Sequence, residues 1–164
     1  MSSLPGQPGG PPTKKILIVD DSGMMRNLVK QILAVDPEVD VIGEADNGQT
    51  CIIKAKELKP DVILLDIEMP VMNGLEAMKR LKLVSRAKVV ILSSVAQVGS
   101  PAAAEAKALG AVAVIPKPSG AVSLDLKAKR GHEIVRIVRQ AVGLPPPDFQ
   151  RMAEMIRLRQ EMGY

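Results

Sequence analysis

Several polar side chains stand directly after short apolar runs of the sequence, at the positions where strands of a sheet would end. Most of them offer oxygen ligands without a nearby His or Cys, which favours Mg²⁺ over zinc. Carboxylates that crowd together repel each other unless a cation neutralises them. If these residues converge, we therefore expect a magnesium site with an ammonium group and a hydroxyl beside it. The residues are Asp20, Asp21, Asp66, Glu68, Ser93, Ser94 and Lys117.

The elements that must position these residues alternate regularly along the chain. Five short aliphatic runs are separated by longer segments whose apolar residues recur at helical spacing. This alternation predicts an α/β fold, a doubly wound five-stranded parallel sheet with right-handed crossovers. The carboxyl ends of parallel strands meet at one edge, so the residues that follow them are expected to lie together. The strands are expected at 16–19, 39–42, 62–65, 89–92 and 112–115.

The two ends of the chain depart from this pattern. The Pro- and Gly-rich residues 1–13 are expected to form a flexible leader, followed by one domain over 14–144. Pro145-Pro-Pro147 is expected to stop the fifth helix, because proline lacks an N–H and clashes with the preceding turn. Residues 145–164 then form a proline linker and a short amphipathic helix, whose apolar stripe is expected to dock on the domain or on a partner.

Charge and composition argue against several classes of function. The 22 Lys and Arg exceed the 18 Asp and Glu by a net charge of +4, which is low for nucleic-acid binding. No apolar run is long enough for membrane insertion. Phe149 and Tyr164 are the only aromatic residues, which disfavours a flavodoxin-like binder that covers its cofactor with aromatic rings. The single cysteine, Cys51, excludes an internal disulfide and favours a reducing, cytoplasmic compartment.

The residues at the strand ends suit the acceptance of a phosphoryl group. Asp66 is the best candidate nucleophile, because it follows the third apolar run and leads into a loop rich in carbonyl groups. A metal ion and Lys117 would neutralise the charge on the transferred group. A phosphatase or phosphotransferase that forms an aspartyl-phosphate is the enzymatic alternative. Glu68 stands where such enzymes carry a second acid, but no residues are left for a substrate-covering cap.

At these residues the chain resembles the response-regulator receiver family, the CheY-like domains of two-component signalling. Four motifs stand in the family's order and spacing: Val19-Asp-Asp-Ser22, Leu65-Asp-Ile-Glu-Met-Pro-Val-Met-Asn-Gly-Leu75, Ile91-Leu-Ser-Ser94 and Ile115-Pro-Lys-Pro118. The resemblance implies that Asp66 accepts a phosphoryl group from a histidine kinase. It also implies an output partner that binds the face of the fourth helix, fifth strand and fifth helix.

The resemblance further assigns roles to single residues. Asp20, Asp21, Asp66 and the backbone carbonyl of Glu68 would hold Mg²⁺. Ser93 would be the switch hydroxyl, and Lys117 would pair with the phosphoryl group before a cis Pro118. The family's usual aromatic residue three positions before the lysine is Val114 here, so the signal is expected to pass through Ser93 and the loop at 95–100.

Within the family the chain is most similar to the receivers of chemotaxis methylesterases, the CheB type, notably at Lys117-Pro-Ser-Gly120 and Ser123-Leu-Asp-Leu126. An esterase domain follows in that type. Here about 20 residues follow Pro145 and His132 is the single histidine, so no esterase triad can be built and the chain is not expected to be an enzyme. A stand-alone receiver and a fragment of a methylesterase both stay open.

Arginines in the last two helical segments allow one more alternative. A stand-alone receiver with an arginine-rich tail could capture a cyclic dinucleotide through these side chains. The competing interpretation is a solvated helix face on which the arginines pair with Glu133, Glu154 and Glu161. The arginines are Arg136, Arg139, Arg151, Arg157 and Arg159.

Overall fold

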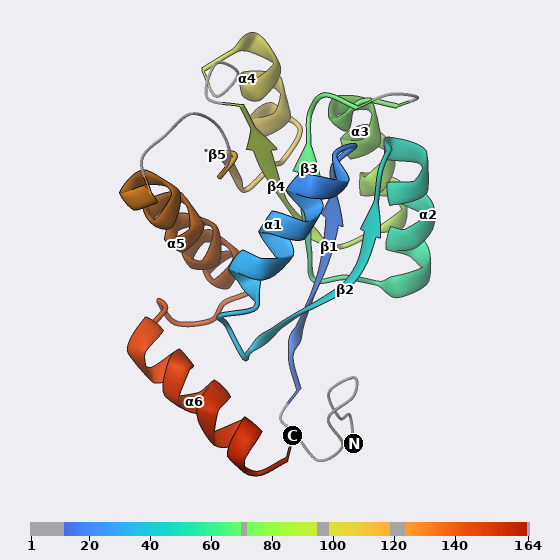
Figure 1. Cartoon of the computed structure of the whole chain (residues 1–164). Coiled ribbons are helices and arrows are strands. Elements are labelled where there is room, and N and C mark those ends of the chain that lie inside the picture. Colours follow the sequence, from blue (N-terminus) through green and yellow to red (C-terminus); the bar gives the residue numbers. More distant parts are fainter. Residues whose placement is uncertain (1–11, 70–71, 95–98, 119–123, 164) are drawn as a thin grey trace.

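The computed structural model describes residues 12–69, 72–94, 99–118 and 124–163. Strands and helices alternate through these residues, as predicted (Figure 1). The strands are β1 (Lys14–Val19), β2 (Val39–Ala45), β3 (Val62–Asp66), β4 (Lys88–Ser93) and β5 (Ala113–Pro116). The helices are α1 (Gly23–Leu33), α2 (Gly48–Leu58), α3 (Gly74–Val84), α4 (Pro101–Ala108), α5 (Leu124–Ala141) and α6 (Phe149–Glu161).

The strands of the described residues form one parallel sheet in the order β2-β1-β3-β4-β5. This order reverses direction at β1, which lies between β2 and β3. Ligands of doubly wound sheets bind beyond the carboxyl ends of the strands at such a reversal. The predicted five-stranded, doubly wound α/β fold is therefore confirmed, and it directs attention to the ends of β1 and β3.

The sheet is covered on both faces, because alternate residues of its apolar strands point to opposite sides. Ile16 and Ile18 of β1 pack with α1 and α5, whereas Leu17 and Val19 pack with α2, α3 and α4. Cys51 of α2 is fully buried on the second face, where burial raises the pKa of its thiol to about 12. Cys51 is thus a small core residue with an unreactive thiol.

The end of α5 differs from the prediction. The helix ends at Ala141, before the three prolines, and Gly143 adopts a left-handed conformation with φ of 77°. The Leu144 N–H donates to the Arg139 carbonyl and the Gly143 N–H donates to the Gln140 carbonyl. These two bonds form a Schellman motif, so the glycine turn ends the helix and the prolines only continue the new direction.

The final helix α6 docks on the domain, which is one of the two predicted alternatives. Met152 is buried in the core between the sheet, α1 and α5, and Phe149 packs against that core. The ring of His132 on α5 stacks on Phe149 with centroids 4.0 Å apart. Arg159 donates a hydrogen bond to the Pro37 carbonyl, beyond the end of α1. In Figure 1, α6 lies near the end of the sheet that is opposite α4.

No helix in the described ranges is sufficiently long and apolar to cross a lipid bilayer.

Candidate functional site

Two central strands carry the acidic residues to one edge of the sheet. Asp66 ends β3, and Asp20 directly follows β1, its neighbour in the sheet. Asp20 and Asp66 are 2% and 3% exposed, whereas Asp21 is exposed. Carboxylate oxygens of these three residues lie within 4.8 Å of one another. The structure therefore brings together the three carboxylates that sequence reasoning selected.

Lys117 reaches this cluster from beyond the end of β5. Its Nζ lies 3.1 Å from Oδ2 of Asp20 and 3.2 Å from Oδ2 of Asp66. Two hydrogen bonds fix the backbone of Lys117. The Lys117 N–H donates to the Ser93 carbonyl at 2.7 Å, and the side chain of Arg130 in α5 donates to the Lys117 carbonyl at 3.3 Å. The ammonium group is thus held between the two buried carboxylates.

Burial and charge shift the proton affinities of the site. Desolvation raises the pKa of Asp66 to about 6, against the lowering effect of Lys117 and with a smaller raising effect of Asp20. Burial by itself would lower the pKa of Lys117, but the carboxylates of Asp66 and Asp20 outweigh it and raise that pKa above its ordinary value. Lys117 therefore keeps its proton at neutral pH, and Asp66 gains a proton more readily than an exposed aspartate.

Backbone donors occupy one oxygen of each buried carboxylate. The Ser22 N–H donates to Oδ1 of Asp20 at 2.9 Å, and the Glu68 N–H donates to Oδ1 of Asp66 at 3.2 Å. The two Oδ2 atoms are buried, and each forms an ion pair with Lys117. Neither accepts a well-directed hydrogen bond from a described group. Such atoms, together with the exposed Asp21, form the hard oxygen set that Mg²⁺ prefers. The residues present therefore fit the magnesium that was predicted.

A cavity of about 710 Å³ opens above the carboxylates. Asp21, Asp66, Glu68 and Lys117 line it, and Ala102 of α4 is also a lining residue. Asp66 is consequently buried on its protein side and still borders space that a small phosphodonor or a donor side chain could enter. Glu68 is exposed, and its backbone N–H donates to the Asp66 carboxylate.

Gly74 is a functional position that sequence reasoning did not identify. A Cβ atom at Gly74 would lie 2.5 Å from the carbonyl oxygen of Asp66 and 2.8 Å from Cα of Ile67. The Gly74 N–H donates to the Ile67 carbonyl at 2.7 Å, and Asn73 caps α3 through its side chain. The missing side chain therefore lets α3 begin against the backbone of Asp66. The pair Asn73-Gly74, shortly after a strand-ending aspartate, was the available signal.

Arg26 was also missed as a site residue. It donates from Nη1 to the Asp20 carbonyl at 2.7 Å and forms an ion pair with Glu44 at 3.0 Å. It thus holds the turn from β1 into α1, which places Asp20 and Asp21. Its place four residues after Ser22, the residue that caps α1, puts it on the first turn of the helix. The positive charge of Arg26 by itself did not indicate that it is a site residue.

Some expectations around the site are corrected or lie outside the described residues. No peptide bond between described residues is cis, so Pro118 follows a trans bond, the form that X–Pro bonds prefer by about 0.5–1 kcal/mol. Ser93 is 2% exposed at the end of β4. Val114 is partly buried against the α4 side of the sheet. Residues 95–98 of the expected signalling loop, and Ser119, Gly120 and Ser123 of the two CheB-type motifs, lie outside the described residues.

Arg139, one of the five arginines of this segment, fits neither interpretation. Its side chain is 3% exposed and donates two hydrogen bonds to Asp36, at 2.9 and 3.1 Å. It also donates to the carbonyl of Pro145 at 2.7 Å and to Glu38 at 3.2 Å. Arg139 and Asp36 therefore form an internal ion pair that connects α5 to the turn before β2. A buried, satisfied guanidinium is available neither to an external anion nor to solvent.

The comparison with protein families decides the identity of the fold. Residues 16–129 match the model of the response regulator receiver domain, which covers more than half of the chain. The chain belongs to the response regulator receiver family. All four motifs quoted from the sequence lie in the matched range, and three of them, at 19–22, 65–75 and 115–118, contribute residues that line the cavity described above.

Similar proteins narrow the type of receiver domain. A protein-glutamate methylesterase/protein-glutamine glutaminase of Syntrophomonas wolfei is 41% identical over 147 residues, which span 88% of this chain and 42% of that protein. The chain thus spans about two fifths of the length of this relative. The crystal structure of the response regulator domain of Thermotoga maritima CheB aligns with a TM-score of 0.72 and 40% identity, covering 82% of this chain and 99% of that one.

A second solved structure concerns a complex. A chain in the crystal structure of the P1 domain of CheA3 with CheY6 from R. sphaeroides is 42% identical, with a TM-score of 0.67. The alignment covers 81% of this chain and 99% of that chain. The predicted receiver fold and the resemblance to the CheB type are therefore confirmed.

Proposed function

We propose that this receiver domain accepts a phosphoryl group on Asp66 from the phosphohistidine of a histidine kinase. The observation that carries the proposal is the position of Lys117 Nζ, 3.2 Å from Oδ2 of Asp66, beside the open cavity. A buried carboxylate at a cavity, with a fixed ammonium beside it, suits attack on a phosphorus atom. The similarity to a chain solved with the P1 domain of CheA3 supports a protein as the donor.

The transfer requires Asp66 in its ionised form. A carboxylate oxygen forms the new O–P bond while the bond between phosphorus and the donor's imidazole nitrogen breaks, and that nitrogen keeps the electron pair. Lys117 supplies a positive charge next to the attacking oxygen, where the negative charge of the phosphoryl oxygens accumulates. The backbone N–H of Glu68 holds the other oxygen of Asp66 and fixes the orientation of the carboxylate.

We assign Mg²⁺ to Asp20, Asp21, Asp66 and the backbone carbonyl of Glu68. When bound, Mg²⁺ supplies positive charge that offsets the repulsion among the carboxylates and the incoming phosphoryl oxygens. The support from this chain is the three carboxylates, whose oxygens lie within 4.8 Å of one another, and the two buried Oδ2 atoms, which accept no hydrogen bond from a described group.

The proposed role is that of a switch rather than an enzyme with turnover. The output surface is the face of α4, β5 and α5, and Ser93 is the hydroxyl that responds to the phosphoryl group. Ala102 of α4 borders the cavity at Asp66, which supports communication from the site to α4. Val114 leaves no aromatic side chain to swing at β5, so the backbone after Ser93 carries the response.

A second candidate role follows from the methylesterase relatives. Their similarity supports a receiver that regulates a methylesterase activity in chemotaxis, with residues 14–144 as the receiver domain and α6 as the segment that leads away from it. The docking of α6 through Met152 and Arg159 would then give such a connection a fixed direction. A cytoplasmic location, as the lone cysteine suggests, stays a prediction.

A radiolabel experiment tests the switch against the enzymatic alternative. The full chain is incubated with ³²P-labelled phosphoramidate, whose P–N bond mimics phosphohistidine, in the presence of Mg²⁺ or EDTA. We expect Mg²⁺-dependent label that stays on the protein and is absent in Asp66→Asn. The exposed control Asp46→Asn should incorporate label normally. Continuous release of phosphate from excess donor, faster than the loss of label from isolated protein, would instead indicate an enzyme.

A further inference from the structure

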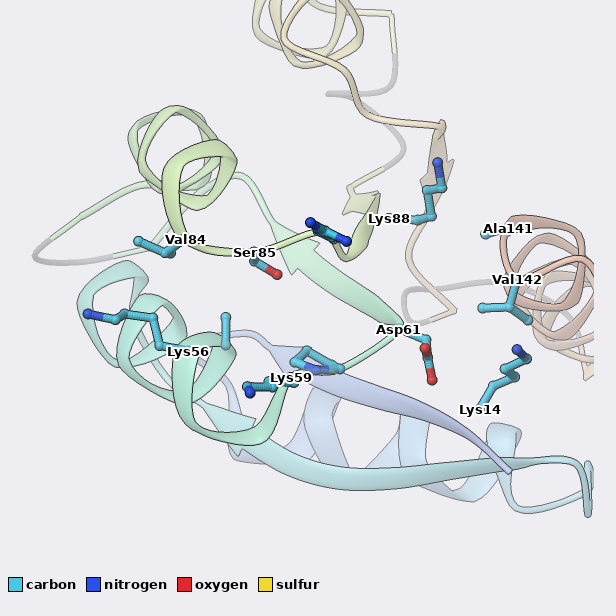
Figure 2. A pocket seen from close by; sticks show the side chains of 12 residues that line it. Lys14, Lys56, Lys59, Asp61, Val84, Ser85, Lys88, Ala141 and Val142 are labelled. Atoms are coloured by element: carbon cyan, nitrogen blue, oxygen red, sulfur yellow. The ribbon is translucent and has the colours of Figure 1, made fainter. Parts of the chain in front are cut away.

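A second hollow lies at the opposite end of the sheet. It has a volume of about 640 Å³ and is bordered by the end of α2, the turn from α3 into β4, the start of β1 and the end of α5 (Figure 2). Asp61, which lines it, directly precedes β3, whereas Asp66 ends that strand. Strand geometry places the two ends of β3 about 15 Å apart. The hollow is therefore separate from the phosphoacceptor site.

Five cations surround this hollow, and we call them the basic pocket: Lys14, Lys56, Lys59, Arg86 and Lys88. None of them forms an ion pair with a described carboxylate. Asp61 is the one acidic residue among the lining residues described, and its Oδ2 already accepts a hydrogen bond from the Lys15 N–H at 2.7 Å. The basic pocket thus carries a charge of about +4, equal to the net charge of the whole chain.

Helix dipoles explain only part of this arrangement. Lys56 and Lys59 lie at the carboxyl end of α2, where cations are favourable. Arg86 directly follows Ser85, the C-cap of α3, so it too lies at a helix carboxyl end. Lys14 and Lys88 instead begin strands, so their positions gain nothing from a helix end. Residues 1–13 contain no Asp or Glu that could neutralise the basic pocket. Cations that repel each other without a partner point to an anion from outside.

The backbone conformation of Lys59 is a second, independent feature of this hollow. Lys59 adopts a left-handed conformation with φ of 50°, at the position after a helix where glycine is usual. A lysine there costs backbone strain that a glycine would avoid. A lysine in this conformation at the rim of a hollow motivates the hypothesis that its side chain has a function.

The lining of the hollow defines the class of ligand. Ala55, Pro60 and Val142 contribute apolar surface, and no described lining residue is aromatic. The volume is in the range of small-molecule sites. Arg86 and Lys88 also border an adjoining hollow of about 250 Å³ together with Lys82, so positive charge continues beyond the first hollow. An extended anion with several charges fits this distribution better than a single flat base or a single carboxylate.

We propose that the basic pocket binds a small anion that carries two or more phosphate groups. Lysine and arginine residues from the end of α2, from the α3–β4 turn and from the first residues of β1 and β4 line it, and their charged groups are donors that suit phosphate oxygens. The binding does not involve Asp66 or Mg²⁺, so the proposal is independent of phosphoryl transfer.

Calorimetry with inorganic pyrophosphate as the probe tests this site. The full chain is titrated in EDTA at low salt, and we expect saturable binding that Lys59→Gln/Arg86→Gln weakens by about tenfold. The control Lys79→Gln/Lys107→Gln removes the same charge from exposed positions elsewhere and should change the affinity by less than about twofold. Lys59→Gly removes the cation and relieves the turn, so it should weaken binding in a protein that is at least as stable.

Amide chemical shifts show where the probe binds. Pyrophosphate should shift the resonances of residues 56–61 and 84–88. The proposal is overturned if binding does not saturate, if both double variants weaken it equally, or if citrate binds as tightly as pyrophosphate. It is also overturned if the shifts cluster at Asp20 and Lys117, because the probe would then occupy the phosphoacceptor site.

Discussion

Arg139 and Asp36, which are 103 residues apart in the sequence, form a buried two-bond ion pair with distances of 2.9 and 3.1 Å. The side chain of Asp36 has no exposed surface, and the side chain of Arg139 is 3% exposed. The pair fixes α5 against the turn between α1 and β2, and the same guanidinium holds the carbonyl of Pro145 at the start of the segment that leads into α6. This one side chain therefore couples the last two helices to the domain.

Removal of Arg139 should destabilise the domain strongly. Arg139→Leu leaves the buried carboxylate of Asp36 without its cation, which costs about 3–5 kcal/mol of unfolding free energy. The exposed neighbour Arg136 serves as the matched control, and Arg136→Leu should change stability by less than about 0.5 kcal/mol. Urea unfolding measures both. The double variant Arg139→Leu/Asp36→Leu should recover much of the lost unfolding free energy. If Arg139→Leu and Arg136→Leu lower the unfolding free energy equally, the ion pair is not buried in solution.

Asp66 should make the domain less stable as the pH rises. Its folded pKa of about 6 is above that of an unfolded aspartate, so the folded state holds the proton more tightly between pH 4 and pH 6. Ionisation of Asp66 across this range costs about 3 kcal/mol of stability, and the cost is constant above about pH 7. Asp66→Asn lacks this titration. In EDTA, the stability of the wild type relative to Asp66→Asn should therefore fall from pH 4 to pH 7; parallel curves would refute the raised pKa.

Asp21 should be needed for the metal although it contributes little to folding. Asp21→Asn removes one negative charge and one oxygen ligand from the cluster, so the affinity for Mg²⁺ should fall by at least about tenfold. The exposed Asp46→Asn is the control and should bind Mg²⁺ as the wild type does. The chain has no tryptophan, so calorimetry or amide chemical shifts are suitable readouts. Unchanged affinity in Asp21→Asn would remove this residue from the site.

Gly74→Ala should damage the site through the backbone. Alanine is the better helix former, so helix propensity alone predicts a more stable protein. The new Cβ would instead lie 2.5 Å from the Asp66 carbonyl oxygen, and we expect a loss of about 2 kcal/mol or more with weaker Mg²⁺ binding. Gly99→Ala, where no heavy atom of the described residues lies within 4 Å of the added carbon, should be nearly neutral. A stabilised Gly74→Ala would contradict the close approach.

Sequence reasoning located the carboxylates because their convergence follows from topology alone. Once the strands are parallel, Asp20 after β1 and Asp66 at the end of β3 must share an edge, and Lys117 follows β5 to the same edge. Arg139 could not be predicted in the same way. Its position within a helical pattern of charges is typical of a solvated face, and its burial depends on a partner more than a hundred residues away.

The remaining differences also have local physical reasons. The expectation that prolines end α5 was wrong, because Gly143 supplies a left-handed turn before Pro145 is reached. The role of Gly74 depends on which backbone passes next to it, and a spacing pattern contains no such information. The basic pocket was missed because its cations come from three separate stretches of the sequence, each with an unremarkable local charge.

The identity of the phosphorylated atom is the central claim, and chemical mapping of the acyl phosphate tests it directly. The full chain is phosphorylated with phosphoramidate and Mg²⁺ and reduced with borohydride, which converts a phosphoaspartate to homoserine, and the modified residue is found by peptide mass spectrometry. The account predicts homoserine at position 66 and at none of the neighbouring aspartates. Homoserine at position 20 or 21, or Mg²⁺-dependent phosphate incorporation that persists in Asp66→Asn, would contradict it.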